Sequence, residues 1–100
     1  MKKICFLIPC YNEQQKIGYI LEELFTFNPF KIVVLNDCST DKSLEILKKY
    51  QKKYKNLTIV NFKKNVGVSK VKITGFAYFQ NLLNNNEIEN EDYLIKLDGD

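Results

Sequence analysis

The chain ends in Asp98-Gly99-Asp100, which places two carboxylates one residue apart. They directly follow Tyr93–Leu97, an apolar run that predicts a buried β-strand. Gly99 lets backbone and ligand approach closely. Mg²⁺ or Mn²⁺ suits such a pair, because the ion takes one or two protein carboxylates together with substrate phosphates. The sequence therefore predicts a divalent-cation site at Asp98 and Asp100 for a phosphate-bearing ligand, whose departure the metal assists as a Lewis acid.

Two further side chains have the chemistry of nucleoside recognition. Asp37 follows a second apolar run, and its carboxylate can accept hydrogen bonds from a base N–H or a ribose hydroxyl. The ring of Tyr11 can pack on the face of a base. Ser39 and Thr40 have two open interpretations, which are turn stabilisation and ligand contact. Asn12, followed three residues later by Gln15, has the pattern of a helix capping box.

Several other chemistries are excluded by composition. The chain has no histidine, which rules out His-based zinc sites and Ser-His-Asp or Cys-His nucleophile pairs. Neither GxGxxG nor GxxxxGK[ST] occurs, so dinucleotide-type and P-loop nucleotide sites are not expected. Cys5, Cys10 and Cys38 have no CxxC spacing and are expected to be reduced thiols. The lysine-rich stretch 48–55 is expected to be a solvated helix face, with no nucleic-acid partner.

The elements that position these residues alternate along the chain. Four short apolar runs predict strands, and three segments with apolar residues at helical spacing predict helices between them. The predicted strands are Lys3–Ile8, Lys31–Leu35, Leu57–Phe62 and Tyr93–Leu97. The predicted helices are one that begins after Asn12 and is closed by Asn28-Pro29, one over about Lys42–Tyr54 and one over about Ser69–Leu83. Pro9 is expected to end the first strand.

This order predicts an α/β fold, a doubly wound and mainly parallel four-stranded sheet with helices on both faces. It is built like a Rossmann-type nucleotide-binding half. Ligands of such sheets bind at the carboxyl ends of the strands. The segments that follow the four strands hold most of the polar residues of interest, so we expect them to meet at one edge. The fourth strand is expected to be an uncovered edge.

Four motifs in this order resemble the signature of the family 2 glycosyltransferases, enzymes of the GT-A fold that transfer sugar from a nucleotide-diphosphate donor, usually with inversion. The motifs are Ile8-Pro9-Cys10-Tyr11-Asn12-Glu13, Val34-Leu35-Asn36-Asp37-Cys38-Ser39-Thr40-Asp41, Asn65-Val66-Gly67 with Gly75, and Leu97-Asp98-Gly99-Asp100. The last of them resembles the branch of dolichyl- and polyprenyl-phosphate sugar transferases. The resemblance spans the whole chain.

The resemblance implies roles for individual residues. Its implied nucleotide-binding residues are Pro9, Tyr11, Asn12, Glu13, Asp37, Ser39, Lys72 and Asp98, and its metal ligands are Asp98 and Asp100. Lys72 stands near the position where many members carry an arginine that faces the phosphates. The implied donor is a UDP- or GDP-linked sugar, and the candidate acceptors are a lipid-linked phosphate or a saccharide. The general base is expected beyond residue 100, so residues 1–100 are expected to form the donor-binding half alone.

Two departures from the family pattern leave an alternative open. Asn36 stands where the family usually has an acidic residue, and Cys38 replaces a glycine of the same turn. The alternative is a non-catalytic nucleotide-binding or interaction module, a truncated or degenerate copy of the enzyme domain.

Composition and the N-terminus give the expected location. The chain has 100 residues, of which 45% are hydrophobic and 27% charged, which excludes collagen-like and largely disordered classes. The five apolar residues before Pro9 are too few for a signal-peptide core, and no run reaches the roughly 20 residues of a membrane span. We expect a cytoplasmic protein, with contact to the inner face of a membrane only through residues beyond Asp100.

Overall fold

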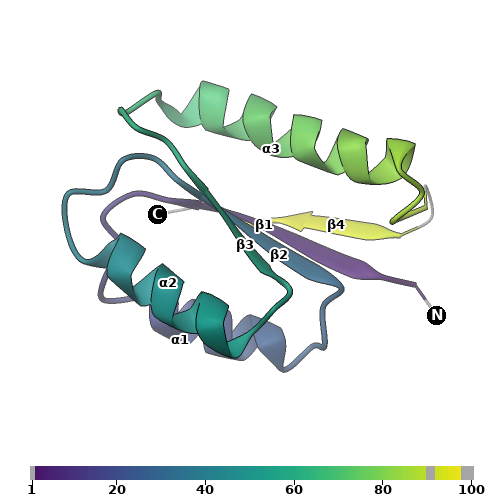
Figure 1. Cartoon of the computed structure of the whole chain (residues 1–100), viewed down its shortest axis with the longest axis horizontal. Helices are drawn as coiled ribbons and strands as arrows, with labels where there is room; N and C mark the ends of the chain where they lie inside the picture. Colours follow the sequence, from purple (N-terminus) through teal and green to yellow (C-terminus); the bar gives the residue numbers. More distant parts are fainter. Residues whose placement is uncertain (1, 90–91, 98–100) are drawn as a thin grey trace.

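The computed structural model describes residues 2–89 and 92–97, and it contains one four-stranded sheet (Figure 1). All strand pairs are parallel, and the order across the sheet is β3-β2-β1-β4. The strands are β1 (Ile4–Cys10), β2 (Lys31–Asn36), β3 (Leu57–Asn61) and β4 (Tyr93–Lys96). The helices are α1 (Ile17–Phe25), α2 (Ser43–Lys53) and α3 (Val68–Asn84). The predicted fold class is therefore confirmed.

Helices cover both faces of the sheet, because β1 and β2 are apolar on both sides (Figure 1). Alternate residues of the two strands, such as Phe6 and Ile8, pack with α1 and α2 in one core cluster. The residues between them, such as Leu7 and Val33, pack with α3 in a second cluster on the other face. Successive strands are added on one side of β1 up to β3 and then on its other side at β4, and the helix before β4 lies on the opposite face of the sheet from α1 and α2.

Helix α3 approaches the sheet closely at Gly75. A Cβ atom built on Gly75 would lie 2.7 Å from both Cδ atoms of Leu7 and 3.1 Å from Cδ1 of Leu35. Real Cβ atoms do not approach neighbours to 2.7 Å in a packed core, so only glycine fits this face of α3 without displacement.

Two predicted boundaries are wrong. Strand β1 does not end at Pro9 but continues to Cys10, with Pro9 opposite Leu35 of β2. Among the described residues, β1 pairs with β4 from Ile4 to Leu7, so the missing N–H of Pro9 interrupts none of the described pairs on that side. Helix α1 begins at Ile17, and no side chain caps its N-terminus, so Asn12 and Gln15 do not form a capping box.

Strand β4 is an edge of the sheet, as predicted, and its side chains are poorly covered. Tyr93, Leu94 and Ile95 are exposed to between 40% and 56%. Ile73 and Phe76 of α3 are also exposed. No helix within residues 2–89 and 92–97 is both long enough and apolar enough to cross a bilayer.

Candidate functional site

The carboxyl ends of the strands bring the predicted site segments to one edge of the sheet. The N–H of Asp37 donates to the carbonyl of Cys10 at 2.9 Å, which places the chain after β2 beside the chain after β1. The N–H of Leu97 donates to the carbonyl of Leu7 at 2.9 Å, so the chain leaves β4 at the same edge. This edge includes the switch point between β1 and β4, where open α/β sheets bind ligands.

We call residues 11–16 the first loop, 37–42 the second loop and 62–67 the third loop. The first two loops are joined by Asn12, which has a left-handed backbone with φ 52°. Its side-chain Oδ1 accepts from the N–H of Thr40 at 2.7 Å and from the N–H of Asp41 at 3.3 Å. The Thr40 hydroxyl donates to the same oxygen at 3.3 Å.

Further hydrogen bonds join these two loops and the start of α2. The N–H of Asn12 donates to Oγ of Ser39 at 3.0 Å, and the Ser39 hydroxyl donates to Oδ1 of the buried Asn36. The N–H of Glu13 donates to Oγ of Ser43 at 2.9 Å. The Ser39 hydroxyl thus stabilises the turn, which is one of the two interpretations left open for this residue. It also lies at the candidate edge of the sheet.

The carboxylate of Asp37 holds the third loop. It is only 7% exposed, and its two oxygens accept from the N–H of Val66 at 2.8 Å and the N–H of Gly67 at 3.1 Å. Gly67 has φ 88°, which favours glycine, and it immediately precedes α3. The carboxylate therefore lies at the N-terminal end of α3, where the helix dipole favours negative charge. Because a carboxylate has about four acceptor positions, two lone pairs remain for another donor.

The other predicted nucleotide-binding residues lie at different places relative to this edge. Pro9 is half-buried near the end of β1, and the ring of Tyr11, just beyond it, is 48% exposed. Glu13 is half-buried in the first loop, where its carbonyl accepts from the first turn of α1. Lys72 is half-buried on the second turn of α3. The structure thus brings Tyr11 and Asp37 to adjacent loops and puts Lys72 on the helix that follows the third loop.

The predicted metal ligands Asp98 and Asp100 lie outside the described residues. Strand β4 and Leu97 nevertheless lead the chain to the same edge as Cys10 and Asp37. Within residues 2–89 and 92–97, no three His, Cys, Asp or Glu side chains cluster as a metal site.

Two titratable groups under the joined loops have shifted pKa values. Burial raises the pKa of Cys10 to about 11, although the Ser43 hydroxyl opposes this, so the thiol stays protonated at neutral pH. Desolvation acts to raise the pKa of Asp41, but hydrogen bonds from Ser43 and from the Gln14 N–H outweigh it and lower that pKa below its usual value. Cys38 is half-buried, and all three cysteines are free thiols, as predicted.

The carboxylate of Asp41 accepts one hydrogen bond from the start of α2 and one from the first loop. Its Oδ1 accepts from the N–H of Ser43, the first residue of α2, at 2.9 Å. Its Oδ2 accepts from the N–H of Gln14 in the first loop at 3.2 Å. The side chain therefore joins the two loops and satisfies the N–H of the first residue of α2, although the N-cap position itself is Lys42.

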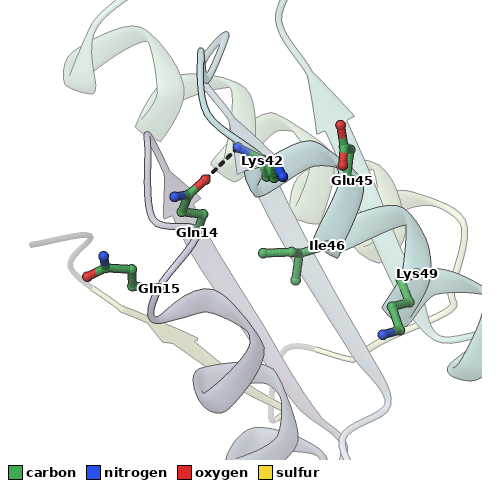
Figure 2. Close-up of a pocket in the computed structure, with 6 residues that line it drawn as sticks. All are labelled: Gln14, Gln15, Lys42, Glu45, Ile46 and Lys49. Carbon is green, nitrogen blue, oxygen red and sulfur yellow. Dashed lines mark hydrogen bonds between the residues drawn. The ribbon is translucent and has the colours of Figure 1, made fainter.

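A groove of about 380 Å³ lies on the α2 side of the joined loops (Figure 2). Its lining residues are Gln14, Gln15, Lys42, Glu45, Ile46 and Lys49. The Lys42 N–H donates to Oε1 of Gln14 at 2.9 Å across its upper end, as the dashed line in Figure 2 shows. None of the residues predicted to bind nucleotide lines this groove, so it is distinct from the candidate edge.

Sequence reasoning missed some contacts that shape the edge. It did not predict that the side-chain amide of Asn36 donates to Asn61 at 2.8 Å, or that the backbone N–H groups of Val66 and Gly67 donate to Asp37. The signals were present in the Asn36-Asp37 pair after a strand and in Asn65-Val66-Gly67, but nothing in a single sequence says that the two motifs meet.

Comparison with known proteins agrees with this arrangement. The family model described as "Glycosyl transferase family 2" matches residues 5–100. The poly(ribitol-phosphate) beta-N-acetylglucosaminyltransferase TarS of Staphylococcus aureus is 37% identical over 71 residues, which cover 67% of this chain and 12% of TarS. The dolichyl-phosphate beta-glucosyltransferase ALG5D of Trichomonas vaginalis is 31% identical over 74 residues, covering 64% of this chain and 23% of that protein.

Solved structures show the same fold. The crystal structure of S. aureus TarS 1–349 in complex with UDP matches 98% of this chain and 27% of that chain, with a TM-score of 0.72 and 27% identity. The mannosyltransferase PcManGT from Pyrobaculum calidifontis, in complex with GDP-Man and Mn²⁺, has a TM-score of 0.68 at 21% identity. It covers 76% of this chain and 24% of its own, and at this identity it shows the fold alone. The family match over residues 5–100, with this parallel sheet, establishes that the chain belongs to glycosyl transferase family 2 and has the GT-A architecture.

Proposed function

We propose that this chain binds a nucleotide-diphosphate sugar through a divalent cation and serves as the donor-binding half of a glycosyltransferase. The observation that carries the proposal is the meeting of the first and second loops with the end of β4 at the switch point of the sheet. TarS, the neighbour with 27% identity, was solved with UDP bound, which supports a nucleoside-diphosphate ligand here.

The proposed site follows from the placement of the described residues. Tyr11 and Pro9 line the nucleoside side, with the Tyr11 ring available to pack on a base. Asp37 keeps free lone pairs that can accept from a base N–H while it holds the third loop. Glu13 and Ser39 belong to the joined loops, which form one wall of the proposed site. Lys72 lies beyond the third loop, where its charge can attract the diphosphate.

For the cation, we propose Asp98 and Asp100 as ligands. Two carboxylates one residue apart fit a hard divalent ion that is also bound by diphosphate oxygens, and Mn²⁺ accompanies GDP-Man in the PcManGT structure. When bound, the ion neutralises the departing diphosphate. The choice between Mg²⁺ and Mn²⁺ is part of the experiment below.

The transfer itself is proposed for the longer polypeptide. The chain spans 12% of TarS and 23% of ALG5D, so the general base and the acceptor site are proposed to lie outside these 100 residues. There an acceptor hydroxyl or phosphate attacks the anomeric carbon in line, with inversion, as the nucleoside diphosphate leaves. The names of the relatives support acceptors that are lipid-linked phosphates or polyol-phosphate polymers. We further propose a cytoplasmic protein that works at the inner face of the membrane.

A second candidate is a nucleotide-binding module without turnover. It is favoured by Cys38, which replaces the family's glycine and has a left-handed backbone with φ 55°. Both candidates expect no turnover by these 100 residues, so the longer polypeptide separates them when it is incubated with a labelled UDP- or GDP-sugar, Mn²⁺ and a lipid-linked phosphate or polyol-phosphate acceptor. Transfer of the label supports the first candidate, and nucleotide binding without transfer supports the second.

The test of donor binding is calorimetric titration of the unaltered chain with UDP and with GDP. We expect binding of one nucleotide with Mn²⁺ or Mg²⁺ present, and loss of that binding in EDTA and in Asp98→Asn. Glu23→Gln, the same change of charge on the exposed side of α1, is the matched control and keeps the binding. If neither nucleotide binds at millimolar concentration while circular dichroism shows a folded chain, the proposal is wrong.

A further inference from the structure

The side chain of Asn12 is the point at which the first and second loops are most densely connected. One atom, Oδ1, accepts three donors, and all of them belong to Thr40 and Asp41, 28 and 29 residues further along the chain. The backbone N–H of the same residue donates to Ser39 at 3.0 Å. A single residue thus supplies four hydrogen bonds between the loops, and these fix how the second loop lies against the first.

The residue type at position 12 fits this task. Its φ of 52° lies in the left-handed region, which asparagine tolerates far better than most residues other than glycine. The carbonyl of a short amide side chain can reach the backbone of a neighbouring loop, and the N–H groups it satisfies would otherwise depend on water. All three side-chain bonds use the carbonyl oxygen, and none uses the amide nitrogen.

We propose that Asn12 is a positioning residue, which acts on the donor through the loops it joins and not by contact with the donor. This inference rests on the proposed function and deepens it. Tyr11 and Asp37 come from the two loops that Asn12 joins, so their relative placement depends on its hydrogen bonds. The site is then assembled before the nucleotide arrives, and the nucleotide need not bear the cost of ordering the loops.

The inference predicts how affinity depends on the carbonyl oxygen. Without this oxygen, the joined arrangement becomes one of several loop conformations. The apparent dissociation constant for the nucleotide then equals the intrinsic constant divided by the fraction of molecules whose loops stay joined. If about one molecule in ten keeps the arrangement, nucleotide binding weakens about tenfold. The amide nitrogen makes none of these three hydrogen bonds, so replacing the amide group by a carboxylate should preserve the joined loops and the affinity for the nucleotide.

Two substitutions separate this role from ligand contact. Asn12→Gly keeps the left-handed backbone and removes the carbonyl oxygen. Asn12→Asp keeps an acceptor oxygen and removes the amide nitrogen. Amide hydrogen exchange, followed by NMR without nucleotide, should show faster exchange of Thr40 and Asp41 in Asn12→Gly and near-normal exchange in Asn12→Asp. The amides of Val66 and Gly67, which Asp37 holds, are the internal reference.

Nucleotide titration of the same variants completes the test, using UDP or GDP, whichever the unaltered chain binds with Mn²⁺. We expect Asn12→Gly to weaken binding about tenfold and Asn12→Asp to stay within about threefold of the unaltered chain. Repeating Asn12→Asp at higher salt screens the added charge. Unchanged exchange of Thr40 and Asp41 in Asn12→Gly would overturn the inference.

A different outcome would assign Asn12 to direct contact. If Asn12→Asp keeps normal exchange but binds as weakly as Asn12→Gly at higher salt, the amide nitrogen touches the nucleotide and the positioning role is wrong. If the unaltered chain is folded but binds neither nucleotide, the proposed function fails, and the positioning role falls with it. Exchange then shows separately whether Asn12 joins the loops.

Discussion

The joined loops and the flank formed by β4 and α3 are built in opposite ways. Asn12, Ser39 and Asp41 connect the first two loops through hydrogen bonds of 2.7–3.3 Å. On the flank, Leu94 of β4 and Phe76 of α3 leave 40% and 49% of their apolar side chains exposed. The polar groups of the joined loops find hydrogen-bond partners within this chain. The flank presents an edge strand of the described sheet and exposed apolar side chains.

The difference indicates where the geometry of the proposed site originates. Side-chain to backbone hydrogen bonds hold the loops after β1 and β2, so this part of the proposed site is held by the chain's own contacts. Strand β4 lies at the edge of the described sheet, where sheets recruit further strands or other chains. The predictions below test this contrast, beginning with the largest expected effect.

Replacing Asp37 by alanine is expected to have the largest effect, because the buried carboxylate connects the second loop to the third. Asp37→Ala leaves the N–H groups of Val66 and Gly67 without their acceptor and should lower the free energy of unfolding by about 2–4 kcal/mol. Urea denaturation measures this loss. Nucleotide binding should fall with it, because the start of α3 is released.

Asp37→Asn is the matched variant, since it keeps one acceptor oxygen and the shape of the side chain. It should lose less stability than Asp37→Ala and should retain protection of one of the two amides in hydrogen exchange. A loss below about 0.5 kcal/mol for Asp37→Ala, the range of ordinary surface changes, would show that the third loop is held by other contacts.

Gly75→Ala is expected to have the next largest effect, because α3 meets the sheet there without room for a methyl group. Displacing Leu7 and Leu35 costs about 1–3 kcal/mol, and the better helix propensity of alanine offsets up to about 1 kcal/mol of it. Thermal and urea unfolding should show a net loss. Gly18→Ala is the control, because its Cβ would approach its nearest neighbour, the Tyr50 side chain, no closer than 3.3 Å. Equal losses in both variants would contradict the close approach of α3.

Comparison of the predicted and observed elements indicates which features of this fold a single sequence can predict. The four strands and the three helices were predicted correctly, because apolar periodicity is a local signal. The end of β1 was not predicted correctly, because Pro9 stays in the strand opposite Leu35 of β2, and that neighbour is far from Pro9 in the sequence.

The sequence predicted where the candidate site lies in the fold, but it did not predict which hydrogen bonds hold the site together. Parallel topology alone brings Tyr11 and Asp37 to one edge. The side chain of Asn12 was predicted to cap α1, but it bonds the second loop instead, since tertiary partners 28 residues away compete with the local N–H groups. A single sequence does not indicate whether the Asn12 side chain bonds the nearby helix start or the distant second loop.

The exposed flank should make the chain associate with itself. Sedimentation velocity at increasing concentration should show self-association of the unaltered chain, and Leu94→Lys should reduce it by placing a charge on the strand edge. The variant should change stability by less than about 0.5 kcal/mol, because the site is half solvated. Lys48→Glu, a charge change on exposed α2, serves as a control that leaves association unchanged; a monomeric unaltered chain at all concentrations contradicts the prediction.

The smallest effect is expected at Asp41, whose pKa is lowered by its hydrogen bonds. Because the folded-state pKa lies below the unfolded value of about 3.9, the carboxylate contributes stability that is present above that pH and is lost as pH falls through the folded pKa. Asp41→Asn should therefore cost stability at pH 6, by about 0.5 kcal/mol or less once solvent screening is counted, and this difference should shrink toward pH 2. Urea denaturation across this range measures it, with Glu23→Gln as the charge-matched control. A difference that grows on acidification would show that the carboxylate destabilises the joined loops, which would contradict their description as a satisfied polar network.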